Sequence, residues 1–130
     1  MSCLRCRRGI VSLEFAILAS VLIPLTSAII ELGLLLWTQT AMQSVAALTA
    51  RCAAIGACTS SAASYAVTQA SNWTLSGAIT TANVTVGTST TCNSASGTFA
   101  TVTITFPVWS KMVLKPFLPD SISVSSCYYN

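Results

Sequence analysis

The sequence predicts an α+β fold built on one long N-terminal helix. Three observations lead to this prediction: an uncharged run over residues 15–30, an amphipathic helical pattern that follows it, and three stretches after residue 77 in which apolar and polar residues alternate. Alternation with a period of two is typical of half-buried strands. We therefore expect a three-stranded antiparallel sheet that packs one face on the second half of the helix.

Composition limits the functions that the chain can perform. It has 130 residues, with only six Lys or Arg, three Asp or Glu, and no His. Beyond the apolar helix Asp120 is the only acid, so no acid–base pair can be assembled there. Cys3 and Cys6 lack the second pair of ligands that a structural zinc site needs. The chain has no basic patch outside its N-terminal head. We expect no catalytic residue, cofactor, metal site or nucleic-acid partner.

The first 37 residues combine a basic head with a membrane helix. Three arginines precede Gly9, and the apolar segment that follows exceeds the ~20 residues that cross a bilayer. Glu14 and Glu31 lie about 26 Å apart along a helix, so each can sit near one side of the hydrocarbon layer. The arginines favour a cytoplasmic N-terminus. The predicted parts are a cytoplasmic head (1–9), a transmembrane helix (10–37) and an extracytoplasmic α+β domain (38–130).

The later elements follow from local periodicity and from turn residues. The helix that begins near Ile10 is expected to continue to Ile55, because Gly56 is a natural stop. Hydroxyl residues at 59–61 can cap a second, short helix that ends near Trp73. After Gly77 the pattern predicts strands around 82–86, 100–106 and 122–124, a turn-rich loop over 88–97 and an apolar connection over 107–119.

Four cysteines lie beyond the apolar run, and they can form three different pairings. In a meander the first and third strands run in the same direction, which brings Cys92 and Cys127 to the same end of the sheet. Cys52 and Cys58 are close in sequence across the Gly56 turn. We therefore favour Cys52–Cys58 and Cys92–Cys127, while the other pairings and free thiols stay open. Two disulfides would matter in a domain with a thin core.

The order Arg8-Gly9-Ile10-Val11-Ser12-Leu13-Glu14-Phe15 resembles the processing site of type IV pilin-like precursors. The resemblance implies that a prepilin peptidase cuts on the cytoplasmic side, between Gly9 and Ile10, and removes residues 1–9 as a leader peptide. It also implies a role in subunit assembly for Glu14 and Phe15. The Glu14 carboxylate would pair with the new N-terminal amine of a neighbouring subunit, and a paired buried charge is more tolerable than a lone one.

The match extends further, through Glu31-Leu32-Gly33 and an amphipathic tail that ends near Arg51. Together these features resemble the TadE-like family, pseudopilins of the tight-adherence (Flp-type) pilus machinery. The resemblance implies a minor structural subunit in the bacterial inner membrane that acts in pilus assembly, adhesion or secretion. Its expected partners are prepilin peptidase, other pilin-like subunits, the assembly machinery and membrane lipid. The alternative is an uncleaved single-pass accessory protein with a partner-binding periplasmic domain. Glu31 is expected near the outer membrane interface.

Overall fold

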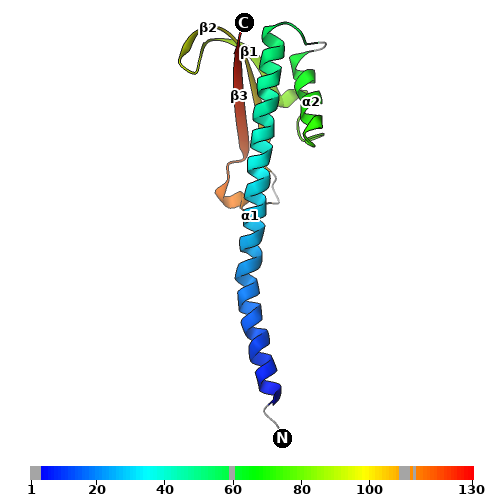
Figure 1. Ribbon diagram of the computed structural model, residues 1–130, viewed down its shortest axis with the longest axis vertical. Helices are drawn as coiled ribbons and strands as arrows, with labels where there is room; N and C mark the ends of the chain where they lie inside the picture. The colour runs from blue at the N-terminus through cyan, green and yellow to red at the C-terminus, as the bar shows by residue number, and fades with distance from the viewer. Residues whose placement is uncertain (1–3, 59–60, 109–111, 113) are drawn as a thin grey trace.

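The protein is a long helix that carries a small α+β domain on its C-terminal half (Figure 1). The computed structural model describes residues 4–58, 61–108, 112 and 114–130, with side chains from Ile10 onward. The helices are α1 (Leu4–Ala54) and α2 (Ala62–Asn72), and the strands are β1 (Val84–Cys92), β2 (Ala95–Pro107) and β3 (Ser121–Tyr129). Two short 3-10 turns, η1 (Thr81–Asn83) and η2 (Lys115–Phe117), precede β1 and β3. The predicted α+β fold class is confirmed.

Helix α1 has two halves with different surroundings. It contains 51 residues and is about 75 Å long. Every large apolar side chain from Ile10 to Ile30 is exposed, because this half projects away from the domain. From Thr38 onward one face of the helix is buried, with a repeat of three and four residues through Met42, Val45 and Thr49. Helix α1 therefore has an exposed apolar half, residues 10–30, which we call the rod, and an amphipathic half that packs in the core of the domain.

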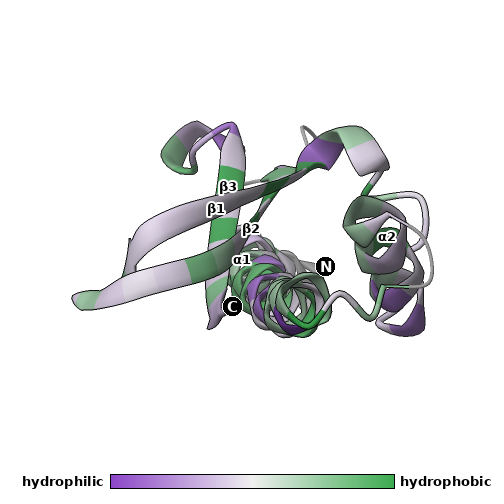
Figure 2. Cartoon of the chain, turned by 90° about the horizontal axis from the view of Figure 1, so that it is seen from above, coloured by the Kyte–Doolittle hydropathy of each residue, from purple (hydrophilic) through white to green (hydrophobic). Residues whose placement is uncertain are grey.

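The core lies where α1 meets the sheet on one side and α2 on the other (Figure 2). Helix α2 contributes the buried Ala66 and Ala70, whose small side chains allow the two helices to approach closely. The sheet contributes a row of directly paired residues, Val84, Ile104 and Val124. The alternation predicted for residues 100–106 is confirmed, because β2 buries its even-numbered residues and leaves Thr105 exposed.

The sheet has the order β1-β2-β3 with antiparallel pairing throughout. The prediction of a loop over residues 88–97 is wrong. These residues extend β1 and β2, and a two-residue turn at Asn93 and Ser94 joins the strands. Both turn residues have positive φ, 46° and 71°, as the tight turns that match strand twist require. The prediction missed this hairpin because its residues are nearly all Thr, Ser and small side chains, which give no apolar contrast.

Other boundaries differ by a few residues. Helix α1 begins at Leu4 instead of Ile10, so the described part of the basic head is helical. Strand β1 begins at Val84, because the Thr80 backbone and hydroxyl donate to the Asn83 side chain and close a 3-10 turn ahead of it. Ser61 caps α2 by accepting from the Ser64 backbone N–H. Residues 1–3 of the predicted leader and 59–60 of the predicted cap lie outside the described residues.

Candidate functional site: the apolar helix and its junction with the domain

The exposed half of α1 carries the residues that the sequence marks for processing and assembly. Ile10 and Glu14 lie one turn apart on the same helix face. Glu14 is exposed and is surrounded in sequence by exposed apolar side chains, including Phe15, of which 72% is accessible. A carboxylate near a helix N-terminus is favoured by the helix dipole. Cleavage after Gly9 would place this carboxylate in the first turns of the shortened helix.

The length of the exposed half matches a bilayer. The most apolar stretch of helix α1 is not buried in the fold, and the length and composition of the helix allow it to cross a membrane. From Ile10 to Ile30 the rise is about 30 Å, the thickness of a typical hydrocarbon core. These apolar side chains have no cover in the isolated chain.

Glu31 joins this helix to the domain. The Leu114 backbone N–H donates a hydrogen bond of 3.0 Å to Glu31 Oε2, across 83 residues of sequence. Leu114 precedes η2, so the carboxylate links the connection between β2 and β3 to α1, directly beyond Ile30. Sequence reasoning placed Glu31 near the outer interface and found no role for it. No local signal could have revealed a partner so far along the chain.

Above Glu31 the junction is packed with apolar side chains. Leu35, Met42 and Phe106 border a cavity of about 10 Å³, together with Met112 and Ile122. A volume of that size holds about one water molecule and no organic ligand. The lower end of the domain is therefore a solid contact between α1 and the sheet, and it positions the connection that Glu31 binds.

The comparison with known families finds one similarity, in helix α1. Residues 9–51, about a third of the chain, match the family model described as TadE-like protein, so this segment is similar to that family. No curated protein and no solved structure matches the chain. The TadE-like segment begins at Gly9, contains Glu14 and Glu31, and ends at Arg51, so it covers the apolar rod and the core half of α1.

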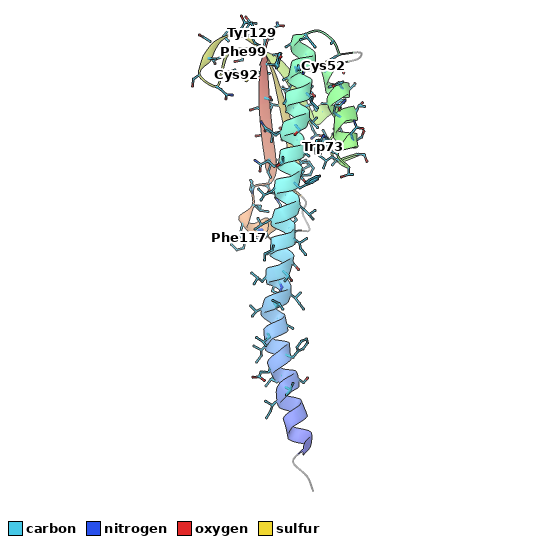
Figure 3. All side chains as sticks on the ribbon, viewed as in Figure 1. Cys52, Trp73, Cys92, Phe99, Phe117 and Tyr129 are labelled. Carbon is cyan, nitrogen blue, oxygen red and sulfur yellow. A yellow bond between two sulfur atoms is a disulfide. The ribbon has the colours of Figure 1, made fainter. Side chains whose placement is uncertain are left out.

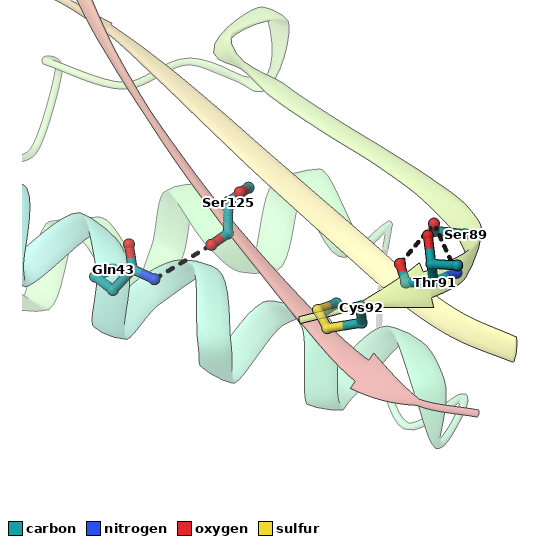
Figure 4. Close-up of a disulfide and its surroundings, with 6 residues drawn as sticks. Gln43, Ser89, Thr91, Cys92 and Ser125 are labelled. Carbon is teal, nitrogen blue, oxygen red and sulfur yellow. Dashed lines mark hydrogen bonds between the residues drawn. A yellow bond between two sulfur atoms is a disulfide. The ribbon is translucent and has the colours of Figure 1, made fainter. Parts of the chain in front are cut away.

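Two disulfides stabilise the part of the domain that follows the TadE-like segment. Cys52 pairs with Cys58 across the end of α1, with 5.4 Å between their Cα atoms. Cys92, at the end of β1, pairs with Cys127 of β3, with 6.3 Å between Cα atoms (Figure 4). These are the pairs that the sequence analysis favours. Cys127 lies opposite Thr101, on the face of β2 turned away from the buried Val102, so the second disulfide crosses the outer face of the sheet.

A β-bulge in β1 directs the end of this strand, with Cys92, toward β3. The register shifts between Ser89 and Thr91, where the Ser89 hydroxyl accepts from the Thr91 backbone N–H and donates to its carbonyl. A bulge bends the strand and increases its twist, which carries Cys92 toward β3. The bent hairpin leaves a polar hollow of about 530 Å³ on the outer face of the sheet. Its walls carry hydroxyl and amide groups and the Cys92–Cys127 disulfide, with no ionisable side chain among the residues that line it.

Proposed function

We propose that this protein is a structural pseudopilin of a tight-adherence pilus system, acting in pilus assembly, adhesion or secretion. The observation that supports the proposal is that the TadE-like segment begins at Gly9, where the sequence changes from an arginine-rich head to an apolar helix long enough to cross a bilayer. The subunit performs no chemistry of its own and binds no cofactor. It is instead a substrate of prepilin peptidase, which cuts between Gly9 and Ile10.

Glu14 gives the rod a specific role in assembly. A charged side chain inside the hydrocarbon layer is costly unless it is paired, so an acid in an apolar helix is stabilised by a partner of opposite charge. Cleavage after Gly9 creates an ammonium group on Ile10 of each subunit. When rods pack side by side, the Glu14 carboxylate pairs with the amine of a neighbour, while Phe15 and other exposed apolar side chains fill the space between helices.

Orientation follows from charge and from the disulfides. The three arginines of the head favour a cytoplasmic location for residues 1–9, with the domain in the periplasm. Disulfides persist in that oxidising compartment. The partners are then prepilin peptidase, other pilin-like subunits, the assembly machinery and inner-membrane lipid. The alternative is an uncleaved single-pass accessory protein, in which the periplasmic domain binds a partner and Glu14 has no amine to meet.

Replacement of Glu14 tests the assembly role. In cells that contain the complete pilus system, Glu14→Ala should insert into the membrane as the wild type does, while its recovery in the assembled fraction falls at least tenfold. Thr26→Ala is the matched control, because Thr26 lies on the same rod and its hydroxyl bonds only its own helix in the described contacts. Recovery of Glu14→Ala at the wild-type level would refute the counter-ion role.

A further inference from the structure

The connection between β2 and β3 carries an apolar side chain with no cover. Phe117 is 86% exposed, more than any other large apolar residue described. It ends η2, a turn closed by a hydrogen bond of 2.9 Å from its backbone N–H to the Leu114 carbonyl. Figure 3 shows its ring at the lower end of the domain, pointing away from the core. A rigid turn therefore presents an aromatic ring that the fold itself does not use.

The height of this turn along α1 is fixed. Leu114 is bonded to Glu31, which follows Ile30 directly, while exposed apolar side chains continue along α1 as far as Trp37. Phe117 follows Leu114 by one turn of 3-10 helix, so it lies beside the end of the rod and not beside the core of the domain. If the rod spans the hydrocarbon layer, this position is the outer boundary of that layer.

The polar groups of the turn suit such a boundary. Lys115 donates to the Asp120 carboxylate over 2.6 Å, and this hydrogen bond, with the charge of the ammonium group, lowers the pKa of Asp120. The two charges neutralise each other beside the aromatic ring. Pro116 lacks a backbone N–H, which leaves one fewer donor to satisfy in a medium poor in water. The turn thus combines an exposed ring with an ion pair between Lys115 and Asp120.

We propose that the turn around Phe117 is a membrane foot, whose ring inserts into the boundary between headgroups and acyl chains on the outer leaflet. The occupant is lipid, because the ring continues the apolar surface of the rod at the level where that surface meets the membrane boundary. The inference rests on the membrane span in the proposed function and is independent of cleavage. The foot and Glu31 together set the depth of α1, with Ile10–Ile30 in hydrocarbon and the Glu31 carboxylate just outside it.

Photocrosslinking of the full chain tests this proposal. We would place p-benzoyl-L-phenylalanine at position 117, at position 23 in the rod, or at position 129 at the far end of the sheet. Ile23 is 64% exposed and Tyr129 is 67% exposed, and the Tyr129 ring packs edge-on against the buried Phe99. The purified protein in vesicles of phosphatidylethanolamine and phosphatidylglycerol, and the same protein in cells, are irradiated and analysed by mass spectrometry. Lipid adducts are expected at 23 and 117 and not at 129.

A second variant distinguishes a ring that is held at the membrane boundary from an exposed ring that contacts lipid by chance. Glu31→Ala removes the bond that holds the turn at its height and should reduce the lipid adduct at 117 several-fold, without changing the adduct at 23. An intact Cys92–Cys127 disulfide confirms that each variant has folded.

The outcomes are distinct. Lipid adducts at 23 with none at 117 would overturn the foot and leave the span intact. Protein adducts alone at 117 in cells would also overturn it, and would make the turn an interface between subunits. Adducts at 117 that do not respond to Glu31→Ala would refute the tether. Absence of lipid adducts at 23 would contradict the span itself, and with it the proposed function.

Discussion

Glu31→Ala should release the β2–β3 connection from α1 while the rest of the domain stays folded. The Leu114 backbone N–H donates a hydrogen bond of 3.0 Å to the Glu31 carboxylate, which links the two segments. Alanine removes the acceptor and leaves the helix backbone unchanged. The expected result is local opening around η2, with the sheet and the upper half of α1 unaffected.

The size of the effect follows from the charge and the burial of the acceptor. A hydrogen bond to a charged group contributes about 1.5–3 kcal/mol. Glu31 is only half-buried, so the lower part of that range applies, about 1.5–2 kcal/mol. Because 1.4 kcal/mol is a factor of ten, the Leu114 amide should exchange with deuterium about 10 to 30 times faster. Glu31→Gln keeps a neutral acceptor and should give a smaller increase.

Hydrogen exchange resolved to single residues is the assay, on the full chain in nanodiscs. The Ile104 amide, in the centre of the sheet, is the internal reference and should not change, because Ile104 is fully buried and distant in the fold from Glu31. If Leu114 exchanged at the wild-type rate in Glu31→Ala, the carboxylate would not hold the connection. That result would refute the role assigned to Glu31, which is to hold the β2–β3 connection against α1.

Three further predictions concern the domain. Ile104→Ala should lower the unfolding free energy of the domain by about 2–5 kcal/mol, because the Ile104 side chain is fully buried. Thr105 is exposed, so Thr105→Ala should change this free energy by less than ~0.5 kcal/mol. Pulse proteolysis in urea measures both values. Loss of the Cys92–Cys127 bond, which closes 35 residues, should cost about 4 kcal/mol, and loss of Cys52–Cys58, which closes 6, about 2 kcal/mol; double Cys→Ser variants in the same assay give both values. Lys115→Met should raise the pKa of Asp120 toward 3.8; a carbon-13 titration of the carboxylate follows it.

Each of these predictions has a result that would contradict it. Equal losses for Ile104→Ala and Thr105→Ala would mean that β2 does not bury its even-numbered side chains. A larger loss from the short disulfide than from the long one would contradict the chain-entropy argument. For Asp120 the folded-state pKa lies below the ordinary value, so the ion pair favours folding above that value and is lost as the pH falls through the lowered pKa. An unchanged pKa in Lys115→Met would exclude Lys115 as the cause.

The long helix and the fold class could be predicted because their signals are local. The apolar run, the repeat of three and four through Met42 and Val45, and Gly56 as a stop are all visible within short windows of sequence. Gly56 does have a positive φ of 64°, and the Ala57 N–H bonds back to the Cys52 carbonyl, as expected just beyond a helix end. The strand over residues 100–106 was equally clear because large apolar residues alternate with threonines.

What could not be predicted depends on contacts between distant segments or on strands without apolar contrast. The hairpin around Asn93 and Ser94 has polar or small side chains on both faces, so its period of two is invisible in hydropathy. The contact of Glu31 with Leu114 requires the topology of the whole sheet, since it joins the first helix to the last connection. The exposure of Phe117 has the same cause: only the folded chain shows that this aromatic residue faces away from the core.

The intact mass of the protein recovered from the membrane and pilus fractions tests the central claim most directly. In cells with an active prepilin peptidase, we predict that residues Met1–Gly9 are missing and that the chain begins at Ile10, with any methyl groups visible as small added masses. Gly9→Leu should block this loss and serves as the control. A wild-type chain that kept its arginine head in those cells would contradict the pseudopilin function, and would favour an uncleaved single-pass accessory protein.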